Sequence, residues 1–217
     1  MDWQAKLTWA EAEHERRLAA AAGPDEREDF RLAGIAGASW AAGLAALMLG
    51  RDDEARVRLL RAAGEYETSW HAAPAGSWGR PIAMIRCRLM AGDHEGARAG
   101  ASAAVADGVL DAPGPIGGYC AALALLALGR GEDAEIVAAR VADEGLQPAA
   151  VADALGAIAR ADDSAYVAAR GAVLRSFEER DAFLEDVRVA DTVLVLDALA
   201  AARGLEPPPV SSPLLPG

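Results

Sequence analysis

Apolar segments along this chain end at a glycine and resume after a short acidic stretch. Three segments, 47–55, 88–97 and 126–134, share an apolar helix end, a Gly, a polar pair or trio, and an Ala five residues after the Gly. A fourth, 157–165, has Arg160 in place of the Gly. Glycine adopts the left-handed conformation that ends many helices without steric cost, and carboxylates stabilise the start of the next helix. Each segment therefore predicts the turn of a helical hairpin.

The second helix of each predicted hairpin has apolar residues four, seven and eight positions after the shared Ala. This spacing places three side chains on one helical face, so the same face should be buried in every hairpin. The twelve positions are Leu59, Ala62, Ala63, Ala101, Ala104, Val105, Ala138, Val141, Ala142, Ala169, Ala172 and Val173.

Further helices are expected on both sides of the hairpins. A first helix over 2–22 should stop at Gly23-Pro24, and a second should run from there to Leu49. The stripe of the first helix consists of Trp3, Leu7, Ala10, His14 and Leu18. Near the other end, 189–204 predicts an apolar closing helix. Prolines keep the tail after it extended, with a frayed terminus as the expectation, although Leu214 and Leu215 could dock on the stack or on a neighbouring molecule.

The composition agrees with an all-α fold. Hydrophobic residues make up 53% of the chain and aromatic residues 5%, and Ala is abundant while β-branched residues are sparse. We expect a single helical domain over 1–204 with about 9–10 helices and a Pro-rich extended tail over 205–217. The hairpin copies should lie at about 36–68, 81–109, 115–145 and 148–180.

The turn pattern resembles the tetratricopeptide family, whose hairpins turn through a Gly and have a small Ala five residues later. The matching pairs are Gly50 with Ala55, Gly92 with Ala97, and Gly129 with Ala134, and Gly43 and Ala122 lie near the small site of the first helix. The chain departs from the family in its unequal copy spacing and in Ile85, which occupies the small site of the second copy. The resemblance covers residues 36–180 and implies a right-handed α-solenoid with a non-catalytic binding role.

Charge limits the classes of partner. The formal net charge is −12 and Lys6 is the only lysine, so a phosphate backbone would be repelled and nucleic acid is not expected as a partner. Residues 32–50 contain no charged side chain, and this stretch is long enough to span a membrane. Most of them are Ala and Gly with charged flanks, so we expect a buried helix and no membrane association.

Two cysteines, Cys87 and Cys120, lie in apolar stretches without the spacing of a disulfide framework or a metal site. They are expected to be reduced core residues. The N-terminal residues mix charges from position 2 and have no apolar region like that of a signal peptide. Both features favour a cytoplasmic protein.

No established catalytic motif is present, so the sequence favours a non-catalytic protein with no cofactor and no metal. Glu11 and His14 have the ExxH spacing of a di-metal bundle, but no second copy exists. His14 also lies on an apolar stripe, which favours a hydrogen-bonded structural histidine. Acidic pairs such as Asp52-Asp53 are expected at helix starts without any catalytic function.

The second hairpin has charged residues where its equivalents are apolar. Arg86 and Arg88 lie six and four residues before the turn glycine, at positions occupied by Leu44, Ala46, Leu123 and Leu125 in the other copies. A buried charge needs a partner. Each arginine pairs with a nearby acid, such as Glu65, Glu67 or Asp93, extends its long side chain to solvent, or faces a ligand.

The stretch 69–80, SWHAAPAGSWGR, concentrates aromatic and cationic residues just before the same helix. It is expected to be an insertion between the first two hairpins, because the step from Gly50 to Gly92 is the longest between turns. Its candidate binding residues are Trp70, His71, Trp78 and Arg80. The two tryptophans either cover the core where the stack is interrupted or form one wall of a binding site with Arg86 and Arg88.

Three function classes follow. The first is a module that binds a protein or peptide segment, such as an acidic peptide or a free C-terminus, in a groove centred on Arg86 and Arg88. The second is a small-molecule-binding protein or enzyme with a pocket walled by the 69–80 stretch. The third is a structural protein that self-associates as a homodimer through exposed Trp3, Trp9 and the Leu214-Leu215 pair.

Overall fold

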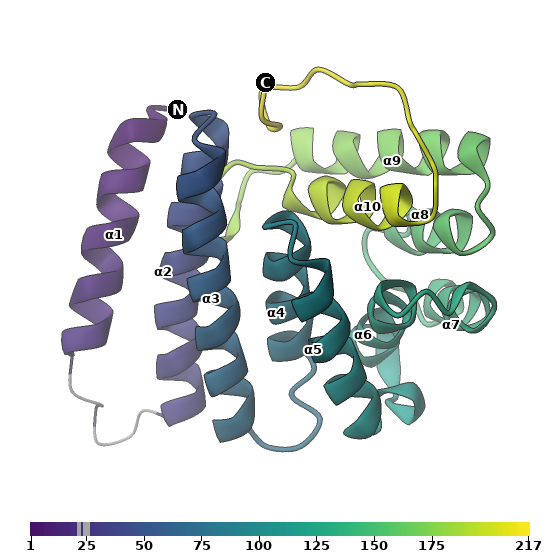
Figure 1. Cartoon of the computed structure of the whole chain (residues 1–217), viewed down its shortest axis with the longest axis horizontal. Helices are drawn as coiled ribbons and strands as arrows, with labels where there is room; N and C mark the ends of the chain where they lie inside the picture. Colours follow the sequence, from purple (N-terminus) through teal and green to yellow (C-terminus); the bar gives the residue numbers. More distant parts are fainter. Residues whose placement is uncertain (21–22, 24–26) are drawn as a thin grey trace.

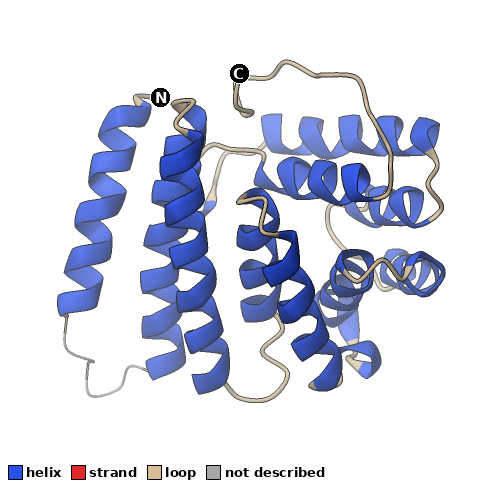
Figure 2. Cartoon of the chain, in the orientation of Figure 1, coloured by secondary structure: helices blue, strands red, loops and turns tan. Residues whose placement is uncertain are grey.

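Short turns divide the chain into helices that pack against one another in sequence order (Figure 1). The computed structural model describes residues 1–20, 23 and 27–217. Within those residues the secondary structure is helical and no strand occurs (Figure 2), which confirms the all-α prediction. The elements are α1 (Trp3–Ala19), α2 (Glu28–Met48), α3 (Asp52–Ala72), α4 (Gly79–Met90), α5 (His94–Ala106), η1 (Val109–Asp111), α6 (Gly114–Ala127), α7 (Gly131–Asp143), α8 (Ala150–Ala159), α9 (Asp163–Glu178), η2 (Leu184–Asp186) and α10 (Asp191–Ala202).

Four helical pairs follow α1 and meet a final helix. The pairs α2–α3, α4–α5, α6–α7 and α8–α9 span 28–72, 79–106, 114–143 and 150–178, near the four expected copies. The last helix, α10, does not continue this series of helical pairs. It packs across α4, α8 and α9, so the final element of the chain contacts the second helical pair as well as the fourth (Figure 1).

The turns inside the four pairs have one geometry. Gly50, Gly92 and Gly129 have φ of +67°, +67° and +76°, the left-handed conformation expected for a glycine that ends a helix. At the third turn Gly129 N donates to Leu126 O at 3.0 Å and Arg130 N to Leu125 O at 2.9 Å, which is the Schellman pattern.

The fourth turn shows that the predicted register of that copy was wrong by one residue. The left-handed residue there is Ala161, with φ +53°, and Arg160 is the last residue before it. The Ala161 amide donates to Ile158 O at 3.1 Å, and Asp162 N donates to Ala157 O at 2.9 Å. Five residues after each left-handed residue the side chain is buried: Ala55, Ala97, Ala134 and Tyr166. Tyr166 therefore fills the position that Ala occupies in the other pairs.

The predicted apolar face of the second helices is largely correct. Nine of the twelve side chains are buried; Val105 and Ala172 are half-buried, and Ala142 is exposed. Helix α2, which contains most of the uncharged 32–50 segment, has the length and composition of a membrane span, with a mean hydropathy of 1.3. However, 67% of that window is buried inside the protein, as expected of a core helix.

Helix α1 ends at Ala19, three residues before the predicted end at Ala22, which lies outside the described residues. His14 is buried and its Nε2 lies 2.7 Å from Glu65 Oε1 on α3, which confirms a hydrogen-bonded structural histidine. Leu18 was assigned wrongly to the buried stripe, because its side chain is 55% exposed.

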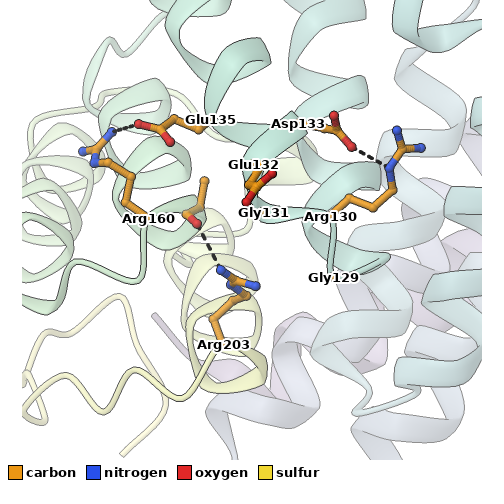
Figure 3. A pocket seen from close by; sticks show the side chains of 9 residues that line it. Gly129, Arg130, Gly131, Glu132, Asp133, Glu135, Arg160 and Arg203 are labelled. Carbon is orange, nitrogen blue, oxygen red and sulfur yellow. Dashed lines mark hydrogen bonds and ion pairs between the residues drawn. The ribbon is translucent and has the colours of Figure 1, made fainter.

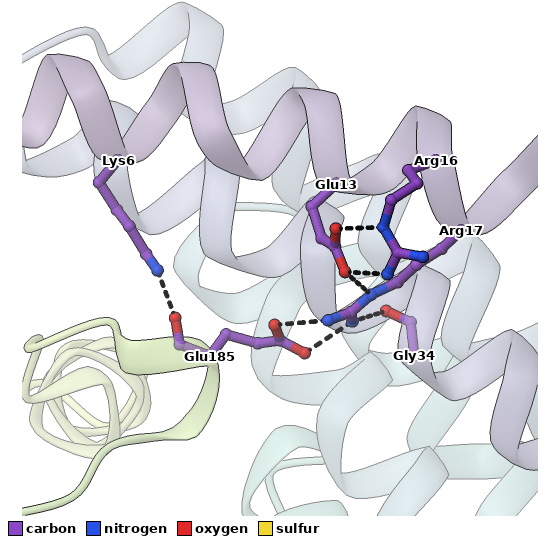
Figure 4. A network of polar contacts seen from close by, with 6 residues as sticks. All are labelled: Lys6, Glu13, Arg16, Arg17, Gly34 and Glu185. Atoms are coloured by element: carbon purple, nitrogen blue, oxygen red, sulfur yellow. Dashed lines mark hydrogen bonds and ion pairs between the residues drawn. The ribbon is translucent and has the colours of Figure 1, made fainter.

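The connection between α9 and α10 contacts the helices at the start of the chain (Figure 4). It reaches α1 and α2, where Arg17 Nη1 lies 2.7 Å from Glu185 Oε1 and Lys6 Nζ donates to the Glu185 carbonyl at 2.5 Å. A Cβ on Gly37 of α2 would lie 3.0 Å from the Glu185 carboxylate, so the helix and the connection approach closely. These contacts of Glu185 hold the connection, residues 179–190, against α1 and α2.

The C-terminal tail is extended, but the expectation of a frayed terminus was wrong. Arg170 Nη1 donates to Pro208 O at 3.1 Å as the tail crosses α9, and Ala190 N donates to Leu214 O at 2.8 Å beside the start of α10. Leu214 and Leu215 are both buried within their own chain. The tail is therefore docked on the helices, and this leucine pair is not exposed for a homodimer contact.

Candidate functional site

The stretch 69–80 is only partly the loop insertion that was predicted. Helix α3 continues through Trp70 and His71 to Ala72, and the turn covers only 73–78. The helix extends this far because no Pro or Gly lies between Gly64 and Pro74, and Pro74 disfavours helix at the residue before it. The extra length between the first two turns thus belongs largely to α3, which has 21 residues against 13 in α5.

The residues around this turn form a structural cluster. Trp70 is 9% exposed and its ring stacks on His71 at 6.0 Å between centroids, while Trp78 packs against the hydrophobic core. Arg80 Nη2 lies 3.1 Å from the Oδ2 of Asp29, which is 4% exposed. The tryptophans therefore lie against the helical stack, and Arg80 neutralises a buried carboxylate of α2.

Arg86 and Arg88 are separated by the helix on which they lie. Two residues apart on α4, their side chains leave in different directions. Arg88 Nη1 lies 2.9 Å from Asp93 Oδ2 and its Nη2 lies 3.3 Å from Glu67 Oε2, so it pairs with two of the predicted acids. The structure thus does not bring together the six predicted binding residues.

Arg86 pairs with an acid that was not anticipated. Its Nη2 lies 2.5 Å from Asp191 Oδ2 and donates to Thr192 Oγ1 at 3.2 Å. Both partners are the first residues of α10. Burial lowers the Arg86 pKa, but the Asp191 carboxylate, together with smaller contributions from the neighbouring Tyr119, Cys87 and Tyr66, outweighs burial and holds that pKa above its ordinary value. The Arg86 Nε is buried without a hydrogen bond, and no partner contacts its Nη1 among the described residues.

A small pocket lies beside this ion pair, where α2, α4, α9, α10 and the 179–190 connection meet. Its volume is about 180 Å³. The lining residues are Trp40, Arg86, Phe177, Arg180, Ala182, Phe183, Leu184, Val187, Val189, Asp191 and Thr192.

The second arginine of the pocket, Arg180, has no acid of its own. No carboxylate of the described residues forms an ion pair with it, and its one hydrogen bond is from Nε to Ser176 O at 3.2 Å. Its guanidinium lies over the Phe177 ring, 3.7 Å from the centroid. Burial and the neighbouring Arg86 lower the Arg180 pKa, although Asp191 opposes them. Arg180 remains charged at neutral pH, since even a lowered arginine pKa lies far above 7.

Three aromatic side chains form the apolar walls of the pocket: Trp40 of α2, Phe177 of α9 and Phe183 of the connection. The two phenylalanine rings lie 6.2 Å apart between centroids with a 46° tilt. No hydrogen bond is formed by the Trp40 indole N–H with any described residue. The pocket therefore combines apolar walls with uncommitted donors, which is typical of ligand sites.

The groups behind Arg86 are neutral. Burial raises the pKa of the Tyr66 and Tyr119 hydroxyls, and it raises the pKa of the Cys87 thiol to about 12. The lining therefore carries the charges of Arg86, Arg180 and Asp191 alone, a net charge of one positive unit in a protein of net charge −12.

A larger surface depression of about 600 Å³ lies between α7, the end of α8 and Arg203 (Figure 3). Arg130 Nε lies 2.8 Å from Asp133 Oδ2, and Arg203 Nη2 donates to the Ala159 carbonyl at 3.1 Å. Arg160 similarly faces Glu135 at 3.6 Å. Arg203 has no acidic partner among the described residues, but the three arginines of this lining are balanced by Glu132, Asp133 and Glu135, so the depression has no net charge and is a weaker candidate for an anion than the pocket at Arg86.

One feature of the sequence points to the pocket. Trp40 is the only aromatic side chain in the uncharged 32–50 segment. Arg180 and Asp191 could not be identified, because their proximity to Arg86 depends on the return of α10 to α4.

No three His, Cys, Asp or Glu side chains of the described residues are grouped so that they could hold a metal ion. No family model matches the chain, and neither a curated protein nor a solved structure is detectably similar to it. The geometry of the pocket is therefore the basis for a functional assignment.

Proposed function

We propose that this chain is a non-catalytic helical-repeat binding protein, and that the pocket between α4, α9 and α10 receives an anionic group. The observation that carries the proposal is that two arginines, Arg86 and Arg180, line the pocket with a single carboxylate, Asp191, which pairs with Arg86. A partly buried charge without a partner costs free energy, so a ligand that supplies the missing negative charge is favoured there.

The position of α10 supports binding in a pocket over binding in an open groove. A peptide groove centred on Arg86 would need the face of α4 that α10 contacts. The carboxylate expected from a peptide is supplied there by Asp191 of the same chain. Binding through a small pocket next to α10 is therefore favoured over binding of a long segment across α4.

The resemblance to tetratricopeptide hairpins supports a binding role by analogy. Three glycine turns and the small buried residues that follow them agree with that family, as do the consecutive helical pairs. In an open solenoid the last helix would not pack against the second helical pair, as α10 does against α4, and Glu185 would not reach Arg17 of α1. We therefore propose a tetratricopeptide-like helical repeat whose binding face is closed rather than open.

Catalysis is disfavoured by the chemistry of the pocket. Its lining contains no histidine or cysteine, and its one carboxylate is held by Arg86 at 2.5 Å. A general base must be free to accept a proton from a substrate, which Asp191 in this ion pair is not.

The experiment is a titration followed by tryptophan fluorescence and calorimetry. The probes are benzoate, phenyl phosphate and neutral benzyl alcohol, and the proteins are wild type, Arg180→Gln and the control Arg175→Gln, which changes an exposed arginine of the preceding helix α9. We expect saturable binding of an anion by wild type and Arg175→Gln, about tenfold weaker binding by Arg180→Gln, and none of the alcohol. If neither anion binds, or if Arg180→Gln binds as tightly as wild type, the assignment of this pocket is wrong.

A further inference from the structure

Resting on the proposed function, we infer that the ligand class is a single carboxylate carried on a small flat apolar body. The carboxylate would lie between Arg180 and the free side of Arg86, and the apolar body between Trp40, Phe177 and Phe183. Such a group occurs in a free aromatic acid and in the C-terminal aromatic residue of a peptide.

The charge of the pocket selects a monoanion. Arg86 and Arg180 contribute two positive charges and Asp191 one negative charge, so one carboxylate brings the lining to neutrality. A phosphate monoester carries a charge of about −1.5 to −2 at pH 7. It would leave an excess negative charge next to Asp191, in surroundings where an unpaired charge is poorly solvated.

The available donors match the two oxygens of a carboxylate. Arg86 uses only Nη2 for Asp191 and Thr192, which leaves Nη1 without a partner. Arg180 uses only Nε, which leaves both of its Nη groups. The Thr192 hydroxyl accepts from Arg86 and retains its own proton to donate. In addition, α10 begins at the pocket, so the partial positive charge of its first turn favours an anion there.

The size and walls of the pocket select the body of the ligand. A volume of about 180 Å³ is below the range of about 300–1,000 Å³ typical of sites for drug-sized ligands. If one heavy atom occupies at most the roughly 30 Å³ of a liquid water molecule, the pocket holds at least about six heavy atoms, which is the size of one aromatic ring. Aromatic walls favour a flat ring, because stacked and tilted rings attract one another beyond the burial of their area.

The test compares ligands that differ only in the anionic group. Wild type, Arg180→Gln, Trp40→Phe and Arg175→Gln are titrated at pH 7.5 with benzoate, phenyl phosphate and benzamide. Two short peptides ending in phenylalanine, one with a free C-terminus and one amidated, separate the two sources of the carboxylate. We expect benzoate or the free-terminus peptide to bind wild type about tenfold or more tightly than phenyl phosphate, and benzamide and the amidated peptide not to bind. Arg180→Gln should lose that preference, while Arg175→Gln should keep it.

The outcomes separate this inference from the proposed function. Binding of phenyl phosphate that equals or exceeds the carboxylates and still depends on Arg180 would overturn the carboxylate assignment and leave an anion pocket in place. Failure of all the anions to bind would overturn both. Carboxylate binding that is unchanged in both Arg180→Gln and Trp40→Phe would also overturn the inference, since the ligand would then lie outside the pocket. Circular dichroism of each variant establishes that the helical fold is retained.

Discussion

Arg86 of α4 and Asp191 of α10 form an ion pair with 2.5 Å between Nη2 and Oδ2, although they are 105 residues apart in sequence. The pair joins the second helical pair to the final helix and forms one side of the proposed anion pocket. Breaking the pair should therefore affect both stability and the position of α10.

Asp191→Asn tests the contribution of this pair. It leaves the Arg86 charge without its carboxylate in a mostly buried place, and we expect a loss of about 2–4 kcal/mol in the free energy of unfolding, measured by urea denaturation. The matched control is Asp133→Asn, which breaks the Arg130–Asp133 pair, whose side chains are 45% and 51% exposed. That control should change stability by less than about 1 kcal/mol. Equal losses in the two variants would show that the Arg86 pair is not special.

Exchanges between Gly and Ala should change the stability of the protein in a direction set by the local backbone conformation. Gly129→Ala forces a side chain into a left-handed conformation, at φ +76°, and should cost about 1–2 kcal/mol. Ala161→Gly at φ +53° removes the same strain and should not destabilise the protein. Gly64→Ala, in the middle of α3 with open space around it, should stabilise by about 0.5–1 kcal/mol. Thermal unfolding of the three variants checks the signs, and a stabilising Gly129→Ala would contradict the turn geometry.

The origin of the hairpin turns shows what the sequence could predict. Glycine turns and the period of apolar residues are local signals, so the helices and most of their buried faces followed from them. The fourth turn was misplaced by one residue because Ala161 occupies a conformation in which glycine is normally found. The ion pair of Arg86 was missed for a different reason. It depends on α10 packing against α4, and no local pattern encodes a contact between such distant segments.

Both cysteines should be unreactive in the folded protein. Burial raises the pKa of the Cys87 and Cys120 thiols to about 12, so almost no thiolate forms at pH 8. We expect a thiol reagent to label neither cysteine in native protein and both in denaturant, as measured by mass spectrometry. Rapid labelling of Cys87 without denaturant would show that the region behind Arg86 is accessible.

The docked tail should contribute to stability. Leu214 is buried, and its carbonyl accepts from Ala190 N immediately before α10. Leu214→Ala should cost about 2–3 kcal/mol in urea denaturation, toward the lower end for buried leucines because the tail can relax. Val210→Ala, at an exposed tail position, provides the comparison and should change stability little. Equal values for the two variants would mean that the tail is not docked in solution.

Acid should weaken the network on α1 that Figure 4 shows. Hydrogen bonds from Arg16 and Arg17 lower the Glu13 pKa from 4.5 to about 2. Because the folded-state pKa is depressed, the stabilisation is fully present above about pH 4.5 and is lost as the pH falls toward 2. The stability difference between wild type and Glu13→Gln should therefore be largest at pH 7 and smaller at pH 3.5. A difference that grows toward low pH would contradict the assigned ion pairs.

Ligands should enter the pocket at Trp40, Arg86 and Arg180 rather than the region of Trp70 and Trp78. The most direct measurement is a benzoate titration of ¹⁵N-labelled protein that follows the indole N–H signals of its five tryptophans, assigned by Trp→Phe substitution. We expect the Trp40 signal to shift in a saturable manner while those of Trp70 and Trp78 remain in place. Shifts at Trp70 and Trp78 with an unmoved Trp40 would contradict this expectation.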